Sequence, residues 1–161
     1  MENYKYTDVR FADIQILRYR LEGFEQLPLQ QKKLIYCLSE ATLWGRDITF
    51  DQFGLHNLKI RKVLEAIYSG FEGDRNQEEY RCFEEYLRRV WFSNGIHHHY
   101  GCEKFEPRFS EDFFETQVRK LPASQLPLDD GQTVDGLIEE LRRPIFDPHY
   151  MSKRVCTEDG V

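Results

Sequence analysis

Histidines are the residues of this sequence best suited to chemistry, and three of them are consecutive: His97, His98 and His99. In an extended segment alternate side chains share a face, so His97 and His99 could reach one metal ion together with Cys102. Three adjacent histidines cannot all coordinate one ion comfortably, and no spaced fourth ligand is present. Metal binding is therefore the minor hypothesis for this stretch. The main one is a polar cleft lining or a solvated loop.

Thiol chemistry is a weaker hypothesis. The four cysteines lie far apart and include no C-x-x-C pair, a pattern that favours reduced, mostly buried thiols over a disulfide framework. Neither Cys102 nor Cys156 stands in a recognisable nucleophile context, so a small cysteine hydrolase is a poor interpretation.

Hydrophobic periodicity predicts a mainly α fold around these residues, with about five helices. A partly alternating stretch at 11–21 predicts a short extended N-terminal arm, and 93–109 loses helical period and predicts a loop rich in histidine and aromatic residues. The predicted helices span 28–45, 60–71, 78–92, 110–121 and 133–143.

Particular residues should start, end or fill these helices. Ser110 and Thr133 are predicted N-caps, and Pro144 should end the last helix. The first helix carries an apolar stripe of Ile35, Leu34, Leu38 and Ala41. Three large aromatic residues at helix ends could form a ligand platform, but we expect them in the core: Trp44, Trp91 and Phe92.

Length and charge restrict the function. The 161 residues, 40% of them hydrophobic, suit one domain, and 28 acidic residues interspersed with 22 basic ones argue against a nucleic-acid partner. The chain has neither an 18-residue apolar run nor an apolar leader, so no membrane partner is expected. We expect a cytoplasmic protein, or a periplasmic one if a signal peptide has been removed.

Two stretches, 27–68 and 90–109, resemble bacterial dipeptidyl peptidase III-type proteins. The first begins LPLQQKKLIYCLSEATLWG, and the second is VWFSNGIHHHYGCEKFEPRF, in which Asn94 to Tyr100 is the most specific run. The similarity extends from Phe11 to Val155 and includes GQTVDGLIEELRRPIFDP.

This resemblance implies a part of a two-lobed zinc exopeptidase that removes dipeptides from the free N-terminus of short peptides. Members are several times longer, so residues 1–161 would be a single N-terminal, lower-lobe segment whose partners are short peptides and the missing C-terminal segments. The equivalent loop faces the cleft between the lobes, which implies that Asn94, His98 and Tyr100 line peptide subsites. Packing of Tyr100 on Phe105 and Phe109 is the alternative.

The family's zinc motif, H-E-x-x-G-H, is absent, because no histidine here is followed by glutamate. The pair Glu139-Glu140 superficially resembles the family's second motif, but an exposed helix face explains it better. We therefore expect no catalytic residue and no zinc in this chain, and no activity from it alone, although the full-length enzyme would carry zinc. The competing hypothesis is a stand-alone helical module that holds a peptide or a metal with residues 97–100.

Overall fold

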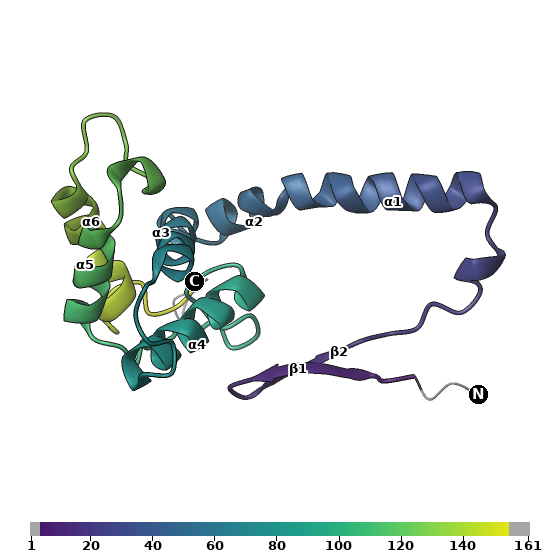
Figure 1. Cartoon of the computed structure of the whole chain (residues 1–161), viewed down its shortest axis with the longest axis horizontal. Helices are drawn as coiled ribbons and strands as arrows, with labels where there is room; N and C mark the ends of the chain where they lie inside the picture. Colours follow the sequence, from purple (N-terminus) through teal and green to yellow (C-terminus); the bar gives the residue numbers. More distant parts are fainter. Residues whose placement is uncertain (1–3, 155–161) are drawn as a thin grey trace, which may run out of the picture. The chain divides into compact units, whose positions relative to one another are not determined.

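The structure, a computed structural model, describes residues 4–154. The chain divides into two units, Met1–Asp47 and Ile48–Val161, which are described in turn. The described part is mainly α-helical, as predicted (Figure 1). Within it, no helix is both long and apolar enough to cross a bilayer.

Unit 1 begins with a β-hairpin. Strand β1 (Thr7–Phe11) pairs antiparallel with β2 (Ile14–Leu17), and Phe11 lies opposite Ile14 next to the turn. Ala12 occupies that turn with a φ of 47°. The predicted arm is thus extended, but it is a hairpin that starts four residues earlier than expected.

The helix α1 (Leu29–Trp44) follows a short 3-10 turn, η1 (Phe24–Gln26), and ends at Gly45 as predicted. None of its residues is buried, and neither is any other described residue of unit 1. The predicted apolar stripe therefore faces solvent, and so does Trp44, which is 89% exposed. The prediction that Trp44 lies in the core was wrong.

The short helix α2 (Arg46–Phe53) was not predicted. Gly45 was interpreted as the end of all helical structure there, whereas its backbone is itself right-handed helical and a new helix starts directly after it. In α2 only Phe50 is buried. A segment with a single core residue has no periodic signal in the sequence.

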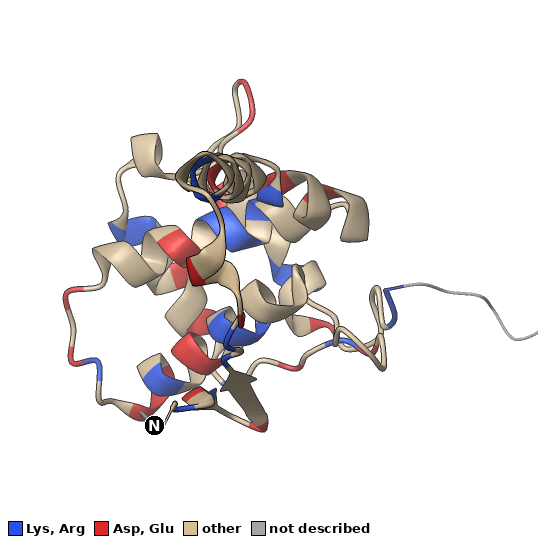
Figure 2. Cartoon of the chain, turned by 90° about the vertical axis from the view of Figure 1, so that its right-hand side faces the viewer, with Lys and Arg blue, Asp and Glu red and all other residues tan. Residues whose placement is uncertain are grey.

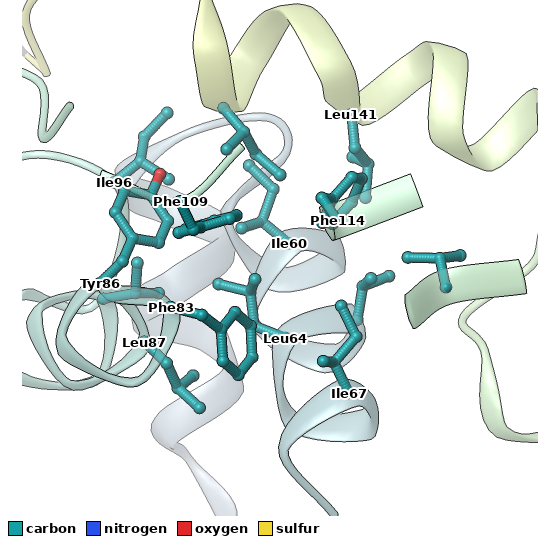
Figure 3. Close-up of a cluster of buried hydrophobic side chains, with 14 of the residues drawn as sticks. Ile60, Leu64, Ile67, Phe83, Tyr86, Leu87, Ile96, Phe109, Phe114 and Leu141 are labelled. Carbon is teal, nitrogen blue, oxygen red and sulfur yellow. The ribbon is translucent and has the colours of Figure 1, made fainter. Parts of the chain in front are cut away.

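Unit 2 holds the core. Four helices build it, α3 (Asn57–Gly70), α4 (Glu78–Ser93), α5 (Glu111–Lys120) and α6 (Val134–Phe146), and each was predicted from its apolar period. Ile60, Leu64 and Ile67 of α3 lie one turn apart and meet Phe83 and Leu87 of α4 (Figure 3).

Aromatic rings extend this core toward α5 and α6. Phe109 contacts Phe83 and Phe146 edge-to-face, with ring centroids 5.6 and 5.5 Å apart. Phe71, just after α3, stacks on Tyr80 at 4.3 Å. Such pairs stabilise by about 0.5–1.5 kcal/mol beyond their buried area.

Two predicted N-caps are confirmed. Ser110 Oγ accepts a hydrogen bond from the Phe113 amide at 3.1 Å, and Thr133 Oγ1 accepts one from the Gly136 amide at 3.0 Å. The predicted end of α6 was wrong, because the helix continues through Pro144 to Phe146. The Asp147 amide still bonds to the Arg143 carbonyl at 3.1 Å, so the proline removes one donor without ending the helix.

The charged residues of α4 form the predicted i, i+4 pairs, Glu84 with Arg88 at 2.8 Å and Glu85 with Arg89 at 3.4 Å. Acidic and basic residues are interspersed over the helices of unit 2 (Figure 2). No single-sign stripe of the kind that binds a phosphate backbone is evident there.

Candidate functional site

The three predicted site residues belong to one ordered segment, residues 94–105, which we call the histidine loop. Its two arms pair antiparallel through His97 and Lys104, and Glu103 pairs in turn with Lys153. Backbone bonds fix both arms: the His98 amide donates to the Glu103 carbonyl at 2.8 Å, and the Lys104 amide donates to the Ser152 carbonyl at 3.0 Å. The loop is thus the middle of a small sheet-like arrangement and has a defined shape.

Helix α3 anchors the base of the loop. Asn57 is 1% exposed, and its Oδ1 accepts a hydrogen bond from the buried Ile96 amide at 3.3 Å. Gly95 lies so close that a Cβ there would overlap the Asn57 side-chain amide. Asn94 ends α4 in the left-handed conformation, φ 54°, with its amide bonded to the Val90 carbonyl. Asn94 therefore has a structural role as a helix cap.

His97 fastens the loop to the C-terminal segment. Its ring is 2% exposed, and Nε2 lies 2.6 Å from the Met151 carbonyl oxygen. Burial lowers the pKa of His97 and outweighs the opposing effect of the Met151 carbonyl. The ring is therefore neutral near pH 7, and Nε2–H donates to Met151. This bond occupies one of the two ring nitrogens through which a histidine can bind a metal ion.

His98 shapes the tip of the loop. Its Nδ1 accepts hydrogen bonds from the Tyr100 amide at 3.2 Å and the Gly101 amide at 3.0 Å. An unprotonated Nδ1 leaves the hydrogen of the neutral ring on Nε2, because the two nitrogens have opposite roles. Half-buried His98 is thus a hydrogen-bond donor whose orientation the loop backbone fixes.

Tyr100 is 86% exposed at the tip of the loop. Its ring contacts His99 edge-to-face at 5.3 Å. Phe105 and Phe109 are buried in unit 2, so the alternative that Tyr100 packs on them was wrong. A loop with its own backbone bonds needs no such packing to hold Tyr100 in place.

Trp91 and Phe92 are not core residues, contrary to prediction, and are 37% and 39% exposed. The Trp91 ring contacts Tyr68 of α3 edge-to-face, with centroids 5.7 Å apart. Trp91 Nε1 donates to Glu65 at 2.9 Å, and Phe92 contacts the His99 ring at 4.9 Å. Phe92, His99 and Tyr100 therefore form a continuous, partly exposed aromatic row.

The residues present do not fit a zinc ion. Within residues 4–154 no group of three or more His, Cys, Asp or Glu side chains is arranged to hold a metal.

The cysteines of the described range differ in burial. Cys82 is a buried free thiol and Cys102 a half-buried one. Cys37 is exposed, so the prediction of mostly buried thiols was wrong for this residue. Cys156 lies outside the described residues.

A second polar cluster joins α3 to α6 and was not predicted. Lys59 Nζ lies 2.9 Å from Glu140 and 2.7 Å from Asp129, and His56 Nδ1 is 3.4 Å from Glu140. Glu140 is thus half-buried, which corrects its assignment to an exposed face, whereas Glu139 is exposed and pairs with Arg142 at 2.6 Å.

This cluster is a closed ion pair rather than a proton-transfer site. Burial alone would raise the pKa of Glu140, but hydrogen bonds from Lys59 and Gln132 outweigh it and lower that pKa. Burial opposes the charge of Lys59 as well, yet its hydrogen bonds to Asp129 and Glu140 raise the Lys59 pKa. Both groups stay ionised near pH 7, so neither is suited to act as a general acid or a general base.

A groove of about 1060 Å³ lies elsewhere in unit 2, between the end of α3 and α5. Phe71, Phe113 and Leu121 contribute apolar surface. Exposed charged residues also line it: Glu72, Glu79, Asp112 and Lys120. Sequence reasoning missed this groove, because its residues come from three separate segments that carry no common motif.

Comparison with known proteins finds no matching family model and no matching curated protein.

Proposed function

We propose that this chain is a non-catalytic, peptide-binding part of a larger zinc-dependent exopeptidase that removes dipeptides from the N-terminus of short peptides. Its histidine loop would supply one wall of the substrate cleft, and the zinc and the catalytic base would come from segments outside residues 1–161. The enzyme class rests on the sequence resemblance to dipeptidyl peptidase III-type proteins. We place the enzyme in the cytoplasm.

The observation that carries the peptide-binding role is Tyr100, a large exposed aromatic residue on a loop of fixed shape. A preordered loop loses little conformational entropy when a ligand binds, so its contacts contribute more to affinity. The Tyr100 ring can cover an apolar side chain while its hydroxyl reaches a backbone carbonyl.

His98 and the loop backbone add to this support. The His98 Nε2–H can donate to a peptide carbonyl, which suits recognition that does not depend on side-chain identity. Cys102 and Met151 have positive φ values of 63° and 54° and lie in the loop and in the segment bonded to it. Such conformations are costly for residues other than glycine and concentrate at binding sites.

Apolar surface on α1 supports packing against further segments. Leu34 and Leu38 are each 58% exposed and lie one turn apart on one side of the helix. In an intact two-lobed enzyme, this side would contact chain outside residues 1–161.

Zinc content and dipeptide release test the proposal. Both would be measured on residues 1–161 and on the same chain joined to its downstream coding sequence, with a chromogenic substrate that has a free N-terminus. We expect zinc and activity only in the longer protein. An inactive, zinc-free longer protein would refute the enzyme class.

Tyr100→Ala tests the loop itself. We expect peptide binding to weaken about tenfold, the effect of losing one good aromatic contact, with no change in thermal stability because the ring is exposed. Tyr19→Ala removes another exposed tyrosine, 78% exposed, and is the matched control. Equal peptide affinity in the wild type and Tyr100→Ala would remove the loop from the proposal.

A stand-alone peptide-binding module is the second candidate function, favoured by the groove beside α5. An apolar surface with several carboxylates at its edge suits a short peptide with apolar and basic side chains. This candidate predicts that residues 1–161 bind a peptide tightly by themselves. Phe113→Ala should then abolish peptide binding, whereas Tyr100→Ala should leave it unchanged.

A further inference from the structure

Helix α1 has apolar side chains on opposite sides, and in the described structure both sides are exposed. Leu34 and Leu38 lie on one side. On the other, Leu29, Tyr36 and Trp44 are 67%, 65% and 89% exposed. A helix with exposed apolar side chains on two sides is normally covered from more than one direction. This second side is termed the Trp44 face.

Charges on the Trp44 face identify its partner. Lys33 and Glu40 lie two helical turns apart on this side, between the exposed apolar residues. Within the part of the chain that the structure describes, neither makes an ion pair. The midpoint of α1 falls between Tyr36 and Cys37. Lys33 and Glu40 lie on either side of this midpoint, at equal distances along the helix.

We propose that the Trp44 face binds a second copy of the same helix in antiparallel orientation. A twofold axis between Tyr36 and Cys37 places Lys33 of each copy opposite Glu40 of the other, which gives two equivalent ion pairs. The same axis places Leu29 opposite Trp44 at both ends of the contact. The face is therefore complementary to itself, as a twofold interface requires.

Other occupants fit less well. If the partner were a different protein segment, the opposite charges of Lys33 and Glu40 would not need to lie symmetrically about the midpoint of α1. Because a single helix pair is a small interface, we expect a dimer of micromolar affinity.

Charge exchange in the full chain tests the pairing. Sedimentation equilibrium would be measured for the wild type, Lys33→Glu, Glu40→Lys and the double exchange. Each single variant places like charges opposite each other twice, so we expect dimer affinity to fall on the order of tenfold. The double exchange restores both pairs and should restore the affinity. A double variant as weak as the singles would overturn the antiparallel pairing.

Two apolar substitutions test which face is used. Trp44→Ala should weaken the dimer on the order of thirtyfold, as expected for a large aromatic anchor. Leu38→Ala, on the opposite side of α1, is the matched control and should leave the dimer unchanged. Equal effects of the two variants would overturn the assignment to the Trp44 face, and a monomer at every concentration would overturn the proposal altogether.

Cys37 provides an independent readout, because it is exposed and adjoins the proposed axis. A short bis-maleimide should join two wild-type chains and should fail with Cys37→Ser. Circular dichroism would check that every variant keeps the wild-type helix content. Cross-linking that persists in Cys37→Ser would place the contact elsewhere and refute the arrangement.

Discussion

Helices α1 and α4 have the same length, 16 residues, and both contain several large apolar residues, yet only α4 buries them. In α4 these residues recur on one side, where α3 lies against them. In α1 they are spread around the helix, and none of the residues that the structure describes in unit 1 is buried. The difference shows that apolar residues at helical spacing predict a helix in both units, whereas only their concentration on one side of the helix predicts a core.

The sharpest test of this comparison is the same substitution in both helices. Leu87 of α4 is fully buried and Leu38 of α1 is 58% exposed. Leu87→Ala should lower the free energy of unfolding by about 2–5 kcal/mol, because it removes buried methyl groups and leaves a cavity. Leu38→Ala should change it by less than about 0.5 kcal/mol. Chemical denaturation of the two variants would measure both values, and similar losses would mean that α1 is buried.

The next largest effect concerns the anchor of the histidine loop in unit 2. Asn57→Ala leaves the buried Ile96 amide without its acceptor, so we expect a loss of about 1–3 kcal/mol in unfolding free energy. Gly95→Ala should cost a similar amount, because its Cβ overlaps the Asn57 side chain. Gly23→Ala in unit 1 is the control. Gly23 also has a positive φ, but a Cβ added there contacts no other atom, so this variant measures the cost of backbone strain without steric overlap.

The pH dependence of stability follows from His97. Its pKa in the folded protein is lowered by burial, so the unfolded chain takes up a proton more readily. The stabilisation is complete above the unfolded pKa of about 6.5 and is lost as the pH falls through the lower folded pKa.

We therefore expect the unfolding free energy to decrease between pH 7 and pH 5, by no more than about 2 kcal/mol for one proton. Denaturant titrations at both pH values should show a smaller decrease for His97→Gln. His149→Gln changes an exposed histidine and should retain the wild-type slope. An unchanged slope in His97→Gln would assign the pH effect to other groups.

The smallest effect distinguishes capped from uncapped helices. Ser110→Ala and Thr133→Ala each remove an N-cap from unit 2 and should cost about 1 kcal/mol. Helix α1 has no side-chain cap, so Ser39→Ala within it should cost nothing and can raise helix propensity. Thermal melts followed by circular dichroism would resolve the difference. A loss from Ser39→Ala as large as from the cap variants would show an unrecognised contact of α1.

Sequence reasoning predicted correctly that the histidine loop is not helical, but it did not predict the contacts within the loop. The loss of helical period and the glycines identified the histidine loop. The different structural roles of His97 and His98 could not be inferred from the sequence. The role of His97 depends on its bond to the Met151 carbonyl, and that of His98 on the Tyr100 amide in the turn of the loop. The ion pair of Lys59 with Glu140 joins residues 81 positions apart and has no local signature.

The sequence by itself determined the helices of unit 2 and the two N-caps, because apolar period and capping depend on residues a few positions apart. It also determined that no H-E zinc motif is present. The tertiary structure decided which apolar side chains are buried, that Tyr100 is exposed and that Glu140 is half-buried. Those properties depend on segments distant in the sequence, whose contacts local patterns do not encode.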